Sequence, residues 1–314
     1  MMARILAYTS PARGHLYPLT GILLELARRG HDVAVRTLAS EVPLMRSLGL
    51  EASPVAPAVE GMPLDDWRAR NPRDGLVRSV STFAARAPHD AADLRAALDA
   101  ERPDAVVVDV NSWGAAAVAE AAGLPWAMFS PYPLPLPSRD APPFGPGLPP
   151  ATGPLGRLRD ALLRPLVGGA HEKAILPRLN AVRADLGLPA VRSAGEIFRR
   201  PPLLLSLTGE PFEYPRSDWP ESIVMVGPCD WEPPSVSPPW LEDLEGPVVL
   251  VTTSSEFQDD GRLVRVALEG LAGDFTVVAT VPSGDPTDYV AHPGGPGWSG
   301  SSRTRCSWTG RSSR

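Results

Sequence analysis

Short apolar segments alternate along the chain with longer segments of helical periodicity, and this order limits the fold more than any other sequence feature. Residues 3–8 (A-R-I-L-A-Y) are typical of a buried strand, and residues 16–29 repeat apolar side chains at helical spacing. Gly30 is suited to ending that helix, and residues 31–37 (H-D-V-A-V-R-T) alternate as in a second strand. A strand–helix–strand opening predicts a parallel sheet with helices on its faces, which is the α/β class.

The same alternation continues to about residue 228 and begins again after a proline-rich stretch. We expect further helices at 41–48, 76–101, 113–122, 155–166 and 171–186, further strands at 105–110, 125–130, 203–208 and 223–226, and loops at 53–71 and 131–154. A second α/β unit would begin with a strand at 247–252, a helix at 262–271 and a strand at 275–281. The predicted organisation is an N-terminal domain over 1–228, a Pro-rich linker over 229–246, and the start of a second domain over 247–290.

Charge and cysteine content exclude several classes of protein. The 314 residues include 30 basic and 36 acidic side chains, a formal net charge of −6, whereas binding to nucleic acid or to an anionic membrane favours a clustered basic surface. Two cysteines cannot form a disulfide framework, and no stretch of about 20 apolar residues occurs. We therefore expect a cytoplasmic protein that binds neither nucleic acid nor membrane. The residues do not indicate the oligomeric state.

One histidine and one aspartate are placed where they could act together. His15 follows the first strand at the start of a helix, where the positive end of the helix dipole favours a neutral imidazole. Asp109 ends the buried strand A-V-V-V-D, and the carboxyl ends of parallel strands meet at one crevice. Asp109 could orient the ring while His15 takes a proton from a substrate hydroxyl. The same two positions also suit a helix-cap or surface histidine and a turn aspartate.

Three common sites are not supported by the motifs. The turn S-P-A-R-G-H after the first strand lacks the pattern G-x-G-x-x-G, which argues against an NAD-dependent oxidoreductase of the Rossmann type. A phosphate-binding P-loop needs a lysine in the motif G-x-x-x-x-G-K, and Lys173, the one lysine, lies outside any such context. The other histidines have no partners at ligand spacing, so we expect no metal site.

The opening A-R-I-L-A-Y-T-S-P-A-R-G-H-L-Y-P-L, followed by E-L-A-R-R-G-H-D-V, resembles the macrolide-type nucleotide-sugar glycosyltransferases, which have the two-domain GT-B fold. The resemblance continues at P-D-A-V-V-V-D, I-V-M-V-G-P and V-V-L-V-T-T-S-S-E-F and covers residues 3–285. It implies that His15 deprotonates the acceptor hydroxyl and that Asp109 orients it. The implied reaction is an inverting, metal-independent displacement with a nucleoside-diphosphate sugar as co-substrate and no cofactor.

The resemblance also implies which parts of the chain hold the two substrates. The first domain would bind an apolar small-molecule aglycone, and candidate walls of its pocket are Met62, Trp67, Phe83, Trp113, Phe129, Tyr132 and Phe144. Each of these side chains could equally belong to an ordinary core. The nucleotide-sugar is expected near Gly14, Ser254 and Ser255. Ser254 stands where the family usually has glycine, and Glu256 adds a negative charge near the expected phosphates.

The last residues differ from everything before them. Residues 298–314 (W-S-G-S-S-R-T-R-C-S-W-T-G-R-S-S-R) contain no acidic and no aliphatic side chain, and the family's His-Gly-Gly element does not occur. Back-translation with GC-rich codons, read in another frame, yields an apolar pattern that resembles the family segment before that element. We therefore interpret 291–314 as an out-of-frame tail and expect the second domain to be incomplete. The main hypothesis is a glycosyltransferase; the alternative is a non-catalytic acceptor-binding or auxiliary remnant of one.

Overall fold

The chain divides into two compact units, Met1–Glu232 and Pro233–Arg314, and each is described here by itself. The structure is a computed structural model that describes residues 2–151, 153–242, 244, 246–271, 275–289 and 304–307. The boundary between the units falls inside the stretch 229–246 that composition identifies as a linker.

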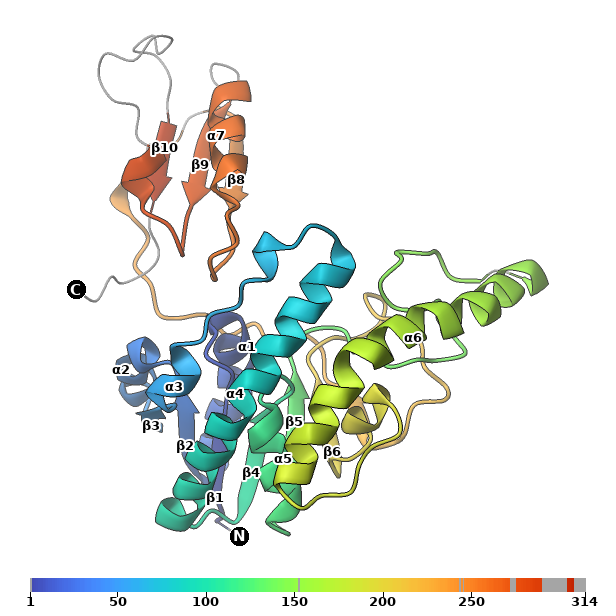
Figure 1. Cartoon of the computed structure of the whole chain (residues 1–314). Coiled ribbons are helices and arrows are strands. Elements are labelled where there is room, and N and C mark those ends of the chain that lie inside the picture. Colours follow the sequence, from blue (N-terminus) through green and yellow to red (C-terminus); the bar gives the residue numbers. More distant parts are fainter. Residues whose placement is uncertain are drawn as a thin grey trace. The chain divides into compact units, whose positions relative to one another are not determined.

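A seven-stranded parallel sheet forms the centre of the first unit, with the strand order β3-β2-β1-β4-β5-β6-β7 (Figure 1). Its strands are β1 (Arg4–Tyr8), β2 (Asp32–Thr37), β3 (Glu51–Pro54), β4 (Ala105–Asp109), β5 (Trp126–Ser130), β6 (Leu203–Ser206) and β7 (Ile223–Met225). The order along the chain reverses between β1 and β4, which lie side by side. Parallel α/β sheets bind their ligands beyond the carboxyl ends of the strands at such a reversal.

Helices cover both faces of this sheet because alternate strand residues point to opposite sides. Ile5 and Ala7 of β1 belong to a core with α1 (Arg13–Arg28) and α2 (Val42–Ser47). Leu6 and Tyr8 belong to the opposite core with α4 (Pro72–Glu101) and α5 (Trp113–Ala121). Outside these, α6 (Pro154–Asp185) packs on α4 and α5 (Figure 1). Short elements are α3 (Pro57–Glu60) and the 3-10 turns η1 (Ala39–Glu41), η2 (Asp66–Arg68) and η3 (Ala194–Phe198).

Two elements differ from the sequence-based expectation. Residues 155–166 and 171–186 were expected as two helices, but they form the single helix α6 with Pro165 and Pro177 inside it. Ala174 and Leu179 of α6 are buried against α4 and α5, and such packing outweighs a low local helix propensity. The strand β3 was not expected, and its last two residues fall in the expected loop 53–71, because the four residues E-A-S-P are too few to show alternation.

The second unit contains a three-stranded parallel sheet in the order β10-β9-β8. Its elements are η4 (Pro239–Leu241), β8 (Val248–Thr252), α7 (Gly261–Gly270), β9 (Thr276–Thr280), η5 (Pro286–Tyr289) and β10 (Thr304–Ser307). The expected strand, helix and strand after residue 247 are therefore present. Most of the stretch 291–314, interpreted above as an out-of-frame tail, lies outside the described residues. The exception is β10, whose backbone pairs with β9.

A close approach of two helices places a strict limit on one residue. A Cβ atom added to Gly114 of α5 would lie 1.8 Å from the carbonyl oxygen of Ala87 in α4, and backbone atoms cannot yield as a flexible side chain can. Gly169 of α6 is a matched control, since a Cβ added there meets nothing within 4 Å.

We expect Gly114→Ala to lower the free energy of unfolding by about 2–3 kcal/mol, because α4 and α5 must separate to make room. Gly169→Ala should leave it unchanged or raise it by up to about 1 kcal/mol, since alanine favours helix. Urea unfolding of both variants measures the difference. Equal stability of Gly114→Ala and the wild type would show that the two helices are not in close contact.

Candidate active site

A histidine and an aspartate meet at the carboxyl edge of the sheet, where β1 and β4 are neighbours. His15 lies in the first turn of α1, and Asp109 is the last residue of β4. Nδ1 of His15 and Oδ2 of Asp109 are 2.6 Å apart. The Asp109 side chain is fully buried and that of His15 is 16% exposed. The adjacent carboxyl ends bring together two residues that are 94 positions apart in the sequence.

Further donors hold the aspartate in place. Oδ1 of Asp109 accepts hydrogen bonds from the Ser10 hydroxyl at 3.0 Å and from the Asn111 backbone N–H at 2.7 Å. A carboxylate accepts hydrogen bonds, so Nδ1 of His15 is the nitrogen that carries the proton. The other ring nitrogen, Nε2, therefore has the lone pair. This is the arrangement in which an imidazole accepts a proton from a substrate hydroxyl.

Two more side chains surround the imidazole ring. Nδ2 of Asn111 is 3.4 Å from Nε2 of His15, and the Tyr132 hydroxyl donates to Oδ1 of Asn111 at 2.7 Å. The rings of His15 and Tyr132 make an edge contact with centroids 6.0 Å apart. Burial, with a contribution from the Asp109 charge, raises the pKa of the Tyr132 phenol, which therefore stays protonated. Sequence reasoning did not single out Asn111, although a polar residue just beyond a buried strand could have indicated it.

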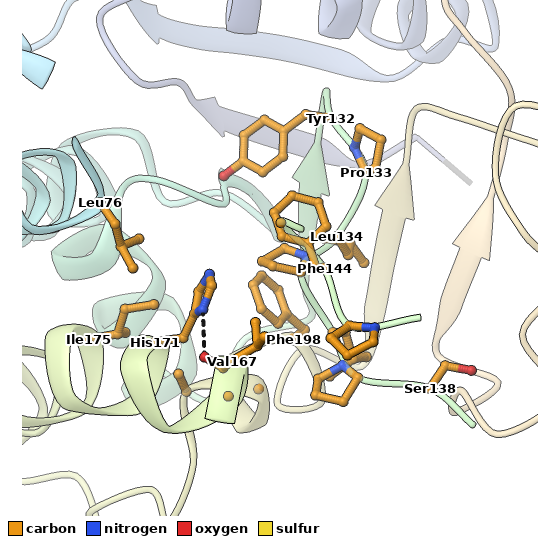
Figure 2. Close-up of a pocket in the computed structure, with 18 of the residues that line it drawn as sticks. Leu76, Tyr132, Pro133, Leu134, Ser138, Phe144, Val167, His171, Ile175 and Phe198 are labelled. Carbon is orange, nitrogen blue, oxygen red and sulfur yellow. Dashed lines mark hydrogen bonds between the residues drawn. The ribbon is translucent and has the colours of Figure 1, made fainter. Parts of the chain in front are cut away.

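A large cavity adjoins these residues. It has a volume of about 630 Å³ and lies among α4, α6 and the segments that follow β5 and β6. Figure 2 shows Tyr132, Leu134, Phe144 and Phe198 on one side and Leu76, His171 and Ile175 on the other. Asn111 and Tyr132 line the cavity and also contact His15. The cavity therefore reaches the dyad through these two side chains.

Only some of the seven residues expected to form the pocket line the cavity. Phe83, Trp113, Tyr132 and Phe144 line the cavity. Phe129 does not: it is fully buried on the opposite face of the sheet, against α1 and α2, because alternate residues of β5 point to opposite sides. Met62 and Trp67 are not among the residues that line the cavity; the Met62 carbonyl instead accepts hydrogen bonds from the Arg86 guanidinium.

His171 is a polar side chain of this cavity that the sequence patterns did not indicate. Nδ1 of His171 donates to the Val167 carbonyl one helical turn earlier, at 3.2 Å, and Nε2 faces the cavity (Figure 2). Two nearby carboxylates serve the protein itself, since Glu172 accepts from the Ala194 N–H and Glu213 pairs with Arg216. His171 thus offers a hydrogen-bond acceptor inside a mostly apolar space.

The residues expected to bind the sugar donor lie in both units. Gly14 is in the first turn of α1, next to His15. In the second unit, the Ser254 N–H donates to Oδ2 of Asp260 at 2.7 Å, and the Ser254 carbonyl accepts from the Ser283 hydroxyl at 3.0 Å. In this turn, which is expected to lie near the nucleotide-sugar, the Ser254 N–H is therefore bonded to a carboxylate of the protein. Ser255 lies in the same turn.

The structure was also considered for a metal site and for a membrane-spanning helix. Among the residues that the structure describes, no group of three or more His, Cys, Asp or Glu side chains is placed to hold a metal ion. Within the same residues, no helix is long and apolar enough to cross a membrane.

A second carboxylate lies buried near the dyad. The Tyr8 hydroxyl lies 3.4 Å from Oδ1 of Asp90 and 3.1 Å from Oδ2 of Asp93, so one proton serves two carboxyl groups. Asp93 also pairs with Arg36 at 3.0 Å, whereas Oδ2 of Asp90 is buried and has no hydrogen-bond partner among the described residues. Burial, aided by the charges of Asp109 and Asp93, raises the pKa of Asp90 to about 7. The native state therefore holds a proton on Asp90 that the unfolded chain releases at a lower pH.

Since the pKa of Asp90 is higher in the native than in the unfolded state, Asp90 should cost stability progressively as pH rises from about 4 to about 7. We expect Asp90→Asn to stabilise the protein more at pH 8 than at pH 5, by about 1–3 kcal/mol in unfolding free energy. Urea unfolding at both pH values measures this. Asp93→Asn is the control and should destabilise at both, because it removes the carboxylate that pairs with Arg36 and accepts from the Ala56 N–H. An effect of Asp90→Asn that is equal at pH 5 and pH 8 would contradict the assignment.

Known proteins resemble the chain in sequence and in fold. No protein-family model matches the chain. The chain is 33% identical over 307 residues to 4'-demethylrebeccamycin synthase of Lentzea aerocolonigenes, covering 93% of this chain and 72% of that protein. The fold is similar to that of the glycosyltransferase of kitacinnamycin (TM-score 0.57, 21% identity, 97% of this chain and 70% of that one). It is also similar to that of CalG4, the calicheamicin glycosyltransferase (TM-score 0.56, 19% identity, 98% and 70%). The chain belongs to the natural-product glycosyltransferases of the GT-B fold.

Proposed function

We propose that the chain transfers a sugar from a nucleoside-diphosphate sugar to a hydroxyl group of an apolar small molecule, with His15 as the base and Asp109 as its partner. The observation that carries the proposal is the 2.6 Å hydrogen bond between Nδ1 of His15 and Asp109, which leaves Nε2 to accept a proton. The similarity to the natural-product glycosyltransferases supports the reaction class.

The proposed step is a single displacement. Nε2 of His15 takes the proton of the acceptor hydroxyl while the hydroxyl oxygen forms a bond to the anomeric carbon of the sugar. The bond from that carbon to the diphosphate oxygen breaks, and the nucleoside diphosphate leaves with the electron pair, so the configuration inverts. The buried Asp109 carboxylate stabilises the imidazolium that forms. General-base assistance of this kind contributes about 10²–10⁴-fold to a rate.

The cavity indicates the chemical class of the acceptor. Its walls are mainly proline, aliphatic and aromatic side chains, and the rings of Phe83 and Trp113 lie 5.9 Å apart. A volume of about 630 Å³ suits a molecule of several fused or linked rings. Nε2 of His171 would accept a hydrogen bond from an O–H or N–H group of that molecule, away from the hydroxyl that receives the sugar.

Replacement of His15 tests the proposed base. With a panel of phenolic acceptors and nucleoside-diphosphate sugars, mass spectrometry should detect glycosylated product for the wild type. His15→Ala should lower the rate at least about 100-fold, since the base is lost. Acceptor affinity should change little, and Asp109→Asn should behave similarly. The matched control is His31→Ala at the opposite edge of the sheet, where Nδ1 accepts from the Ala3 N–H; it should retain the wild-type rate. Undiminished transfer by His15→Ala would show that His15 is not the base.

One observation favours the alternative of a non-catalytic acceptor-binding protein. In the turn that the family resemblance places near the donor phosphates, the Ser254 N–H donates to the Asp260 carboxylate. Calorimetric titration of the 314-residue chain with UDP and dTDP separates the two functions. Nucleotide binding supports the transferase, and acceptor binding without any nucleotide binding supports the alternative.

A further inference from the structure

The proton acceptor of the dyad already has a partner in the structure. Nδ2 of Asn111 lies 3.4 Å from Nε2 of His15, and the Tyr132 hydroxyl lies 2.7 Å from Oδ1 of Asn111. Both Asn111 and Tyr132 line the cavity. The Asn111 amide therefore stands between the cavity and the nitrogen that would receive a proton.

Hydrogen-bond polarity is consistent along this row of groups. The Asp109 carboxylate accepts from Nδ1–H, so Nε2 has a lone pair, and an amide N–H is the Asn111 group that can donate to it. The amide oxygen then faces Tyr132, whose hydroxyl donates to it. The raised pKa of Tyr132 keeps that hydroxyl protonated. Turning the Asn111 amide over would place an oxygen against the lone pair of His15 and would lose the donor to it.

We propose that Asn111, oriented by Tyr132, is a positioning residue that reserves the unprotonated Nε2 of His15 for the acceptor hydroxyl. This inference rests on the function proposed above for His15. An amide N–H that faces Nε2 opposes a second proton there, because two N–H donors would then face each other. A hydrogen bond of 3.4 Å is long and weak, so an incoming hydroxyl can replace it without a large cost.

Other titratable or charged groups lie near His15. Asp109 of β4 binds the opposite ring nitrogen, and Tyr132 contacts the ring by its edge. On the helix of His15 itself, Arg13 pairs with Glu41 of η1 at 2.7 Å. On the far side of the sheet, Asp90 of α4 interacts electrostatically with Asp109. Asn111→Asp replaces the amide that faces Nε2 with a carboxylate of nearly the same shape and so changes a donor into an acceptor there.

Nitrogen NMR of the ¹⁵N-histidine-labelled full chain tests the proposal without any substrate, with the His15 signal assigned from His15→Gln. In the wild type we expect the neutral ring with the proton on Nδ1. In Asn111→Asp the new carboxylate should hold a proton on Nε2, so that the doubly protonated ring persists to a pH at least one unit higher. Asn111→Ala and Tyr132→Phe should give smaller changes in the same direction, because they remove or release the opposing donor. The His31 signal is the internal control and should be the same in all variants.

Two results would overturn the proposal: a proton on Nε2 of the neutral wild-type ring, or proton uptake by His15 at the same pH in the wild type and in both Asn111 variants. Should Asn111→Asp fail to fold, as the His31 signal would reveal, Asn111→Ala and Tyr132→Phe decide the question. The NMR measurement does not depend on sugar transfer. The proposed function is tested separately, and it fails if His15→Ala still transfers sugar at the wild-type rate. Where transfer is measurable, Asn111→Asp should lower kcat/KM about tenfold at pH 7, with a smaller loss at higher pH and little change in KM.

Discussion

The parallel pairing of β1 with β4 is the constraint on which the site depends. The order of strands reverses at this pair, so the chain that leaves β1 enters α1 on one face of the sheet, and the chain that leaves β4 enters α5 on the other. Ser10 and His15 follow β1, and Asp109 and Asn111 lie at the end of β4. Side chains from both segments therefore meet at one edge, and the hydrogen bond between His15 and Asp109 is the direct result.

Burying charged groups at this edge of the sheet lowers the stability of the fold. Asp109 is a fully buried carboxylate, and its hydrogen bonds with His15, Ser10 and the Asn111 backbone offset the loss of water. Its charge also acts on Asp90, where it contributes to a pKa of about 7. The apolar cores on either side of the sheet stabilise a region that contains two buried carboxyl groups.

Much of the first unit could be predicted from the sequence because its elements are strongly periodic. The strand 105–110 and the helix 113–122 show clear apolar patterns, and the structure has both within one residue at each end. The pairing of His15 with Asp109 was expected from the rule that the carboxyl ends of parallel strands meet at one crevice, together with the family resemblance. The residues alone left open a helix-cap histidine and a turn aspartate. Phe129 was wrongly expected to line the pocket, because the sequence shows an aromatic residue near a strand end but not the face of the sheet to which its side chain points. The single helix α6 and the roles of Asn111 and His171 depend on contacts between distant segments, which local patterns do not contain.

The proposed function requires the acceptor hydroxyl to reach Nε2 of His15 from the apolar cavity. A crystal structure of the chain with a phenolic acceptor bound tests this requirement. We expect the acceptor's rings inside the cavity and its hydroxyl oxygen about 2.6–3.2 Å from Nε2, in the place of the Asn111 amide. An acceptor bound elsewhere, or bound in the cavity with its hydroxyl directed away from His15, would refute the proposed function.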